Sequence, residues 1–135
     1  MTGGEKDLWL VVENDDDDFL LFSRACSRAL DREPCIHREK DGAAAKQFLA
    51  ESRQAPRLII SDLNMPGMNG LEFLEWVRQQ DTFNRVLFVM LSNSAVERDV
   101  TTARNLGADD YQVKPSEFPK FVSLIKKLNE RQAAA

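Results

Sequence analysis

Four side chains that can handle charged ligands each follow a short apolar run in this chain. They are Glu13, Asn14, Asp62 and Lys114. In open α/β sheets, ligands bind at the edge formed by the carboxyl ends of the strands. Two carboxylates, an amide and an ammonium group at such an edge would form a polar site, and the sequence predicts that these side chains converge there.

The apolar runs and their spacing predict five strands that alternate with five helices. The strands are expected over residues 8–12, 35–40, 58–61, 86–91 and 111–113. Between them apolar residues recur at helical spacing over residues 19–30, 44–49, 71–77, 96–103 and 118–128. Asn93 or Ser94 is expected to cap the fourth helix, and Val96, Val100 and Ala103 to form its inward face.

Five such units are too few for an eight-unit barrel, so right-handed crossovers should wind a parallel sheet with helices on both faces. The predicted fold class is α/β, a three-layer doubly wound sandwich with strand order 2-1-3-4-5. That order places the first and third strands side by side, which brings Glu13 and Asn14 next to Asp62. Residues 1–135 are expected to form one domain with an ordered core over about 7–130 and loose ends at residues 1–6 and 132–135.

Composition excludes several classes of protein. The 135 residues carry a formal charge of -4, and the pI is about 5.1, so direct binding to a nucleic-acid backbone is not expected. There is no apolar stretch near the roughly 20 residues that span a bilayer and no apolar signal core, so a cytoplasmic protein without membrane contact is expected. Cys26 and Cys35 lack metal-site spacing and are expected to be free buried thiols.

The strand-end residues together carry a family resemblance. Val12-Glu13-Asn14-Asp15, Asp62 with Met65-Pro66 and Gly70, Ser92, and Lys114-Pro115 follow the first, third, fourth and fifth strands in order. This pattern resembles the flavodoxin-like receiver domain of two-component response regulators over nearly the whole chain. Residues 65–74 and 106–111 are similar to the stand-alone bacterial receivers that work with phytochrome-type histidine kinases.

The resemblance implies a role for each of these residues. Asp62 would be the phosphoacceptor, taking a phosphoryl group from a histidine kinase or a histidine phosphotransfer protein. Mg²⁺ would lie between Glu13, Asn14, Asp62 and the backbone carbonyl of Asn64. Lys114 and Ser92 would contact the phosphoryl group, and Tyr111 would turn inward and change the surface that binds a downstream protein. Such a protein is a signalling phosphoprotein rather than an enzyme, with at most self-phosphorylation from small donors and self-dephosphorylation.

Each role has a simpler alternative. An aspartate at a strand end can merely cap a turn, Ser92 can cap a helix, and Lys114 can be a solvated surface lysine. Tyr111 can be ordinary packing on a short edge strand. Asp16, Asp17 and Asp18 are expected to be a solvated first helical turn, favoured there by the helix dipole. The agreement of several strand ends favours the receiver roles for Asp62, Ser92 and Lys114.

Asn14 departs from the receiver pattern, because most receivers carry a metal-binding carboxylate at this position. An amide oxygen brings no charge, so weakened Mg²⁺ affinity is expected, with Asp15 as a substitute ligand if the loop is shifted by one residue. If the metal is lost, the chain becomes a pseudo-receiver that binds proteins without phosphorylation. Self-association into a homodimer through the final helix, at Phe118 and Phe121, stays open beside a monomer.

Two small enzymes are disfavoured by the same segments. A flavodoxin-type FMN site would want a phosphate loop after the first strand, but residues 13–18 are acidic and would repel a phosphate. A haloacid-dehalogenase-like phosphatase would want a second aspartate and a cap insertion, and 62–64 reads Asp-Leu-Asn. The sequence ends after the fifth helix, so either a stand-alone receiver or a part of a larger regulator is expected. The partner kinase, the input signal, the downstream target and the phosphoryl lifetime do not follow from the sequence.

Overall fold

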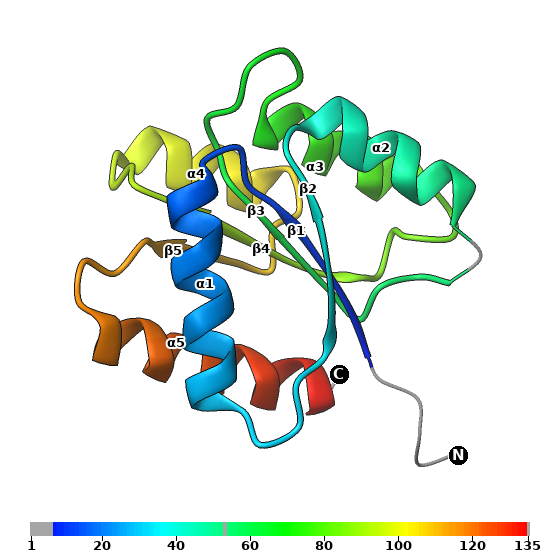
Figure 1. The fold of residues 1–135 in the computed structure, drawn as a ribbon. Coiled ribbons are helices and arrows are strands. Elements are labelled where there is room, and N and C mark those ends of the chain that lie inside the picture. The colour runs from blue at the N-terminus through cyan, green and yellow to red at the C-terminus, as the bar shows by residue number, and fades with distance from the viewer. Residues whose placement is uncertain (1–6, 53, 135) are drawn as a thin grey trace.

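The computed structural model describes residues 7–52 and 54–134, in which five strands alternate with five helices (Figure 1). The elements are β1 (Leu8–Val12), α1 (Asp16–Ala29), β2 (Cys35–Glu39), α2 (Gly42–Glu51), β3 (Leu58–Ser61), α3 (Gly70–Gln79), β4 (Leu87–Ser92), α4 (Glu97–Asn105), β5 (Asp110–Val113) and α5 (Phe118–Ala134). All neighbouring strands pair in parallel, in the order β2-β1-β3-β4-β5. The predicted fold and strand order are therefore confirmed.

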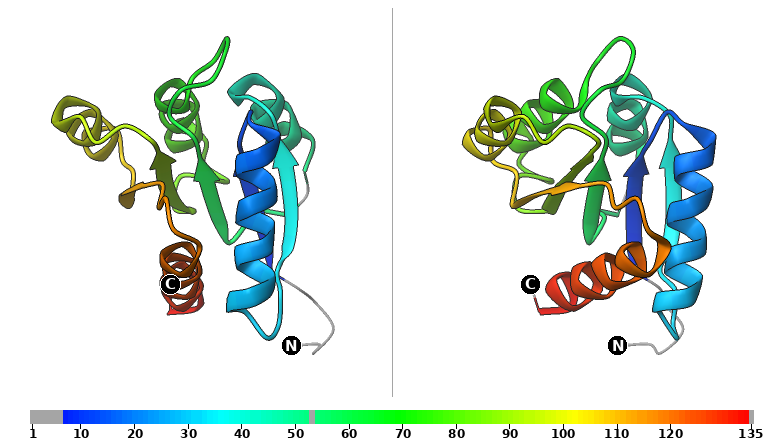
Figure 2. Two further views of the ribbon diagram at one scale, coloured as in Figure 1. Left: turned by 60° about the vertical axis from the view of Figure 1, so that its left-hand side comes forward. Right: turned by 90° about the vertical axis from the view of Figure 1, so that its left-hand side faces the viewer.

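Helices cover both faces of the sheet, which makes three layers (Figure 2). Successive side chains of a strand point to opposite faces, so the central strands feed two separate apolar layers. Trp9 and Ile60 pack with Phe22 of α1 and Phe121 of α5 in one layer. Leu10, Ile59 and Phe88 pack with residues of α2, α3 and α4 in the other. The continuous apolar runs seen in the sequence follow from this two-sided burial.

Strand register decides which residues meet at the carboxyl edge. Val12 lies opposite Ser61, so the next residues, Glu13 and Asp62, leave the sheet side by side. The amide of Asp62 donates to the carbonyl of Val12 at 2.9 Å, which extends the ladder by one bond. At the same carboxyl edge, between β4 and β5, the amide of Lys114 donates to the carbonyl of Ser92 at 2.8 Å. The backbone thus holds all the strand ends in register.

Two strand-level predictions need correction. β4 lies one residue later than expected and includes Ser92, which is therefore part of the sheet rather than of the following loop. Cys35 is exposed, because β2 is an edge strand with only one neighbour, so the expectation of a buried thiol is wrong there. Cys26 is buried as predicted, and burial raises the pKa of its thiol to about 12.

The start of α4 also differs from the prediction. Its N-cap is Val96, which has no side-chain hydrogen bond to the helix, and neither Asn93 nor Ser94 caps it. The Ser94 hydroxyl donates instead to Asp99 at 2.7 Å. Val96 is 55% exposed, so it does not belong to the inward face, whereas Ala103 is buried and Val100 packs against the core.

The last helix continues beyond the expected ordered core. α5 runs to Ala134, and Gln132 is buried while its carbonyl accepts a hydrogen bond from Arg57 at 2.8 Å. The contact to Arg57 explains why residues 132–134 are not a loose end, and residues 1–6 lie outside the described part of the chain. Phe121 belongs to the core, so of the two phenylalanines predicted for a homodimer contact only Phe118, at 37% exposure, lies on the surface of this helix.

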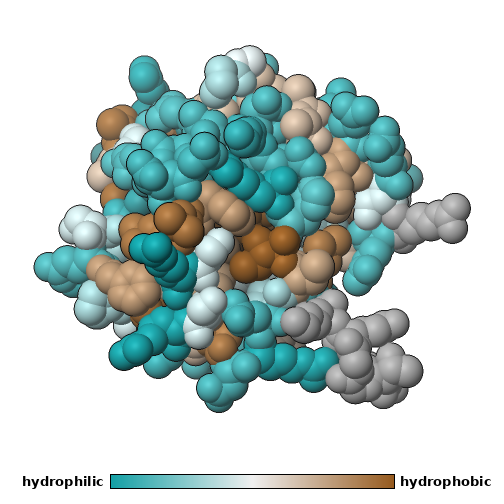
Figure 3. Space-filling model, viewed as in Figure 1, coloured by the Kyte–Doolittle hydropathy of each residue, from teal (hydrophilic) through white to brown (hydrophobic). Residues whose placement is uncertain are grey.

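Among the described residues, none of the helices is both long and apolar enough to cross a bilayer. The face that carries α1 and β2 is mostly hydrophilic, with small hydrophobic areas between the charged side chains (Figure 3). Leu20 on α1 is one of the few large apolar side chains that are exposed.

Candidate functional site

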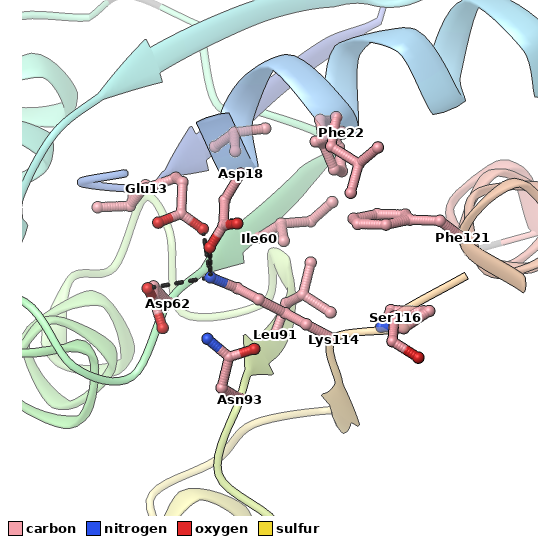
Figure 4. Close-up of a pocket in the computed structure, with 14 residues that line it drawn as sticks. Glu13, Asp18, Phe22, Ile60, Asp62, Leu91, Asn93, Lys114, Ser116 and Phe121 are labelled. Atoms are coloured by element: carbon pink, nitrogen blue, oxygen red, sulfur yellow. Dashed lines mark hydrogen bonds and ion pairs between the residues drawn. The ribbon is translucent and has the colours of Figure 1, made fainter. Parts of the chain in front are cut away.

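Lys114 is the centre of a charged cluster at the carboxyl edge of the sheet (Figure 4). Its ammonium donates to Glu13 Oε1 at 2.6 Å, to Asp18 Oδ2 at 2.8 Å and to Asp62 Oδ2 at 3.2 Å. The lysine side chain is only 8% exposed, so it is not a solvated surface lysine in this structure. Three carboxylates around one ammonium leave the cluster with a formal charge of about -2.

The reach of Lys114 explains why a long side chain is needed at this position. β5 is separated from β3 by β4, and two strand spacings are about 9.6 Å. Lys114 leaves the end of β5, and its aliphatic stem lies beside Leu91 and Ile60 on the way to Asp62 (Figure 4). The stem is thus sheltered by apolar side chains while its charged end meets the carboxylates, the usual behaviour of a buried lysine.

Burial and charge act on the proton equilibria of this cluster in opposite directions. Burial raises the pKa of Glu13 above its ordinary value, and the hydrogen bonds from Lys114 and from the amide of Asp15 only partly oppose that rise. Burial by itself lowers the pKa of Lys114, but the hydrogen bonds to Asp18 and Glu13 outweigh it and raise the pKa above its ordinary value. The lysine therefore stays charged at neutral pH and keeps its attraction for anionic oxygens.

The loop between β1 and α1 is held by Arg38, which lies in β2. Arg38 Nε donates to the carbonyl of Glu13 at 3.0 Å, and its Nη1 lies 2.7 Å from Asp16 Oδ1. Its guanidinium also lies over the ring of Phe19, 4.8 Å from the centroid. Arg38 therefore ties the backbone next to the Glu13 carboxylate to the first turn of α1.

Asn14 and Asp15 do not join the carboxylate cluster. Asn14 is exposed, and the Asp15 side chain caps α1 by accepting from the amide of Asp18 at 3.0 Å. Asn64 is exposed two residues beyond Asp62. The sequence prediction thus placed Glu13 and Asp62 together correctly, while Asp15 acts as a helix cap in this structure.

Asp62 is positioned by the tight connection between β3 and α3. Its Oδ1 accepts from the amide of Leu63 at 2.7 Å, which leaves Oδ2 for Lys114. A Cβ at Gly70 would lie 2.2 Å from the carbonyl oxygen of Asp62, so only glycine allows α3 to start this close. Asn69 and Glu72 form a reciprocal capping box that fixes the beginning of that helix.

Ser92 and Tyr111 are joined through the backbone of Ser94. Ser92 is fully buried, and its hydroxyl accepts from the amide of Ser94 at 3.1 Å. Tyr111 is buried as well, and its hydroxyl donates to the carbonyl of Ser94 at 2.8 Å. The tyrosine ring therefore already has the inward orientation in this structure.

A cavity of about 280 Å³ lies beside the cluster, between α1, α5 and the sheet. Phe22, Leu91 and Phe121 belong to its apolar wall, and Asp18, Asp62 and Lys114 line its polar part (Figure 4). The apolar wall sets a low-dielectric boundary on one side of the charges, which strengthens their interactions relative to bulk water.

Sequence reasoning missed three residues of this site. Asp18 was expected to be solvated with Asp16 and Asp17, but its carboxylate reaches Lys114, so that expectation is wrong for Asp18. No sequence pattern singles out Arg38 as a site residue. Asn93 lines the cavity, although the sequence predicts it only as a helix cap. The available signal for Asp18 was its place four residues before Phe22, on the same face of α1 as the buried residues.

The oxygen atoms at this edge are of the kind that Mg²⁺ prefers. Glu13 and Asp62 offer largely buried carboxylates, and the Asn64 carbonyl and the Asn14 amide lie close to them along the chain. Within residues 7–52 and 54–134 no three His, Cys, Asp or Glu side chains are grouped so that they alone would hold a metal ion. A hard cation that keeps several waters fits this mixed donor set.

Comparison with known sequences identifies relatives of the chain. The model of the response regulator receiver domain matches residues 10–126. Over 87 residues the chain is 48% identical to the nitrate/nitrite response regulator protein NarL of Escherichia coli K12; the match covers 64% of this chain but only 37% of NarL. It is 30% identical to a probable chemotaxis protein CheY of Rhizobium etli, over 93% of this chain and 95% of that one.

Solved structures of receiver proteins share the whole fold. The phosphorylated cyanobacterial phytochrome response regulator RcpA is 26% identical with a TM-score of 0.85, covering 96% of this chain and 95% of RcpA. The Mn²⁺-bound response regulator Rcp1 is 25% identical with a TM-score of 0.81, covering 92% of each chain. The bacteriophytochrome response regulator RtBRR is 35% identical with a TM-score of 0.74, covering 92% of this chain and 78% of RtBRR. With its strand order and strand-end residues, this chain belongs to the receiver domain family of two-component response regulators.

Proposed function

We propose that this receiver takes a phosphoryl group on Asp62 from a phosphohistidine of a partner protein and thereby changes its protein-binding surface. The observation that carries the proposal is the pairing of Asp62 Oδ2 with Lys114 at 3.2 Å beside the buried carboxylate of Glu13. The donor is a histidine kinase or a histidine phosphotransfer protein. The likeness to RcpA and RtBRR supports a phytochrome-type kinase as the source.

In the transfer, an oxygen of the Asp62 carboxylate forms a bond to phosphorus while the bond from phosphorus to the histidine nitrogen breaks. The electron pair of the broken bond stays on the imidazole, which takes up a proton from water. Such a reaction asks for positioning and charge neutralisation, because negative charge spreads over the phosphoryl oxygens. Lys114 supplies a fixed positive charge for these oxygens.

Mg²⁺ would be held by Glu13, Asp62, the Asn64 carbonyl and the Asn14 amide, and it would neutralise phosphoryl charge when bound. The Mn²⁺-bound Rcp1 structure supports a divalent ion in this kind of domain. Because Asn14 brings no charge, we expect Asn14→Asp to tighten Mg²⁺ binding by about 1 to 2 kcal/mol, after partial cancellation by carboxylate repulsion. Mg²⁺ titration by calorimetry measures this, and Asp15→Ala tests the alternative ligand; a larger change in Asp15→Ala would move the ligand to Asp15.

Ser92 and Tyr111 would couple phosphorylation of Asp62 to a change in the protein-binding surface. Rotation of the Ser92 side chain toward a phosphoryl oxygen would move its hydroxyl oxygen away from the amide of Ser94, the residue whose carbonyl holds Tyr111. A shift of Ser94 would therefore change the surface formed by α4, β5 and α5, where a downstream protein would bind. Val113 and Phe118 are exposed on this surface and would also serve a homodimer. The acidic net charge supports a protein rather than nucleic acid as the direct target.

The decisive experiment compares wild type with Asp62→Asn during incubation with acetyl phosphate and Mg²⁺, followed by intact mass. We expect wild type to gain one phosphate and Asp62→Asn to gain none. Asp81→Asn, an exposed carboxylate in the loop after α3, is the charge-matched control and should label like wild type. Phosphate on Asp62→Asn at wild-type yield would move the acceptor to Glu13 or Asp15. No label on wild type would favour a pseudo-receiver that acts by phosphorylation-independent binding.

A further inference from the structure

All the donor capacity of Lys114 is in use in this structure. A lysine ammonium has three N–H donors, and the three acceptors here are Glu13, Asp18 and Asp62 at 2.6, 2.8 and 3.2 Å. A phosphoryl oxygen on Asp62 would be a fourth acceptor for the same group as long as the remaining carbonyl oxygen of Asp62 keeps its hydrogen bond. One of the present hydrogen bonds must therefore break before Lys114 can contact a phosphoryl oxygen.

Solvent access decides which bond breaks at the lowest cost. The Asp18 side chain is 38% exposed, whereas those of Glu13 and Asp62 are 8% and 11% exposed. A carboxylate that leaves an ammonium loses least when water can replace the lost donor. Asp18 is the only one of the three with substantial access to water, so it is the partner that Lys114 exchanges.

We infer that Asp18 is a positioning residue that holds Lys114 in a resting place and releases it when Asp62 carries a phosphoryl group. This inference rests on the proposed function of Asp62. Asp18 competes with the phosphoryl group for the lysine, so it slows phosphorylation. It also joins the first turn of α1 to the end of β5, and this link is absent in the phosphorylated protein.

The surroundings of Asp18 allow the exchange without movement of the helix. The amide of Asp18 is held by the Asp15 cap at 3.0 Å, so the backbone of the first turn stays in place. Asp18 and Lys114 both line the cavity of about 280 Å³, which leaves room for the lysine side chain to shift (Figure 4). Rotation of one carboxylate into water and a small displacement of one ammonium are sufficient.

The first test compares the rate of Asp62 labelling by acetyl phosphate at saturating Mg²⁺ in wild type, Asp18→Asn and Asp17→Asn. Asp17 is exposed in the same helical turn, so its substitution makes the same change in net charge and helix-dipole interaction. We expect Asp18→Asn to label about two- to fivefold faster, the range that a partly exposed ion pair supports. Asp17→Asn and Asp18→Glu should stay within about twofold of wild type. Equal rates for Asp18→Asn and Asp17→Asn would overturn the inference.

The second test asks whether Asp18 acts through Lys114. In a Lys114→Met background, Asp18→Asn should no longer change the labelling rate, because residues that act through one contact are not additive. A persistent acceleration would show a through-space effect on the donor and would overturn the inference. As a readout that does not need labelling, we expect Lys114 to react faster with an amine-specific reagent in Asp18→Asn but not in Asp17→Asn, measured by peptide mass spectrometry.

The two tests distinguish an error in the proposed function of Asp62 from an error in the inferred role of Asp18. Absence of any label on wild-type Asp62 contradicts the proposed function, whatever the Asp18 variants do. Label on wild type together with unchanged Lys114 reactivity in Asp18→Asn contradicts the inference alone.

Discussion

Lys114 is the residue on which the charges of the site depend. Two largely buried carboxylates, Glu13 and Asp62, face it, and both would be left without a counter-charge if it were removed. Breaking one side of a buried ion pair costs more than the pair contributes, because the remaining charge stays desolvated. The charges of the acceptor site therefore stabilise the folded protein only while Lys114 is present.

We expect Lys114→Met to lower the free energy of unfolding at pH 7 by about 1 to 3 kcal/mol, less than for a fully buried pair because Asp18 is partly solvated. Urea denaturation followed by circular dichroism measures the loss. Glu13→Gln in the same chain should restore part of it, since one of the uncompensated charges is then absent. A Lys114→Met protein more stable than wild type would show that the lysine is not needed to balance these carboxylates.

A second residue-scale prediction concerns pH. Burial raises the pKa of Glu13 in the folded protein above its ordinary value of 4.5. The folded state therefore holds the Glu13 proton more tightly, so the favourable contribution is present below the unfolded pKa and is lost as pH rises through the folded pKa. Each unit of the rise corresponds to about 1.4 kcal/mol.

We expect the stability of wild type relative to Glu13→Gln to fall as pH increases from 4 toward neutrality. Urea midpoints measured for both proteins at intervals of half a pH unit test this. Parallel stability profiles for the two proteins would contradict a raised pKa for Glu13.

At the scale of elements, the site depends on how closely α3 begins to β3. Gly70 is the first residue of α3, and a Cβ there would overlap the carbonyl of Asp62 at 2.2 Å. Gly67 in the same connection is a useful contrast, because it has a φ of +71° but nothing within 4 Å of an added Cβ. One glycine is required by close approach and the other by backbone conformation.

We expect Gly70→Ala to cost about 2 to 3 kcal/mol through overpacking and also to slow labelling of Asp62, since the clash is with the backbone of the acceptor. Gly67→Ala should cost about 1 kcal/mol from its left-handed conformation and affect labelling little. Thermal denaturation and the acetyl phosphate assay on the two variants measure both effects. Equal labelling rates in the two variants would mean that the start of α3 does not position Asp62.

At the scale of the whole molecule, two apolar layers share one sheet. Trp9 is fully buried in the layer with α1 and α5, and Trp76 packs against the layer with α2, α3 and α4. Because β1, β3 and β4 contribute side chains to both layers, neither layer can be lost while the other keeps its sheet. The chain should therefore unfold as one cooperative unit.

The two tryptophans test this directly. In Trp9→Phe the fluorescence reports Trp76 and its layer, and in Trp76→Phe it reports Trp9 and the opposite layer. For each variant we expect the fluorescence midpoint in urea to coincide with the midpoint from circular dichroism of that same variant. Separate transitions in either variant would show that one layer unfolds independently.

The alternation of elements and the residues at the strand ends were readable from the sequence. Apolar runs such as residues 58–61 are buried on both faces, and such runs differ clearly from the helical spacing of segments such as 71–77. Right-handed crossovers limited the possible topologies, and the order 2-1-3-4-5 found among doubly wound sheets predicted the meeting of Glu13 and Asp62. Local sequence is sufficient for these features because each depends on burial and backbone connection.

Only the tertiary structure decided which acid completes the cluster and which elements end where. Asp18 and Glu13 meet Lys114 across 96 and 101 positions of sequence, and the outcome depends on the rotation of α1 and the crossing of β4 by a lysine stem. Gln132 is buried for a similar reason, because it meets Arg57 across 75 positions. Such contacts arise from register and helix packing, which a short window of sequence does not specify.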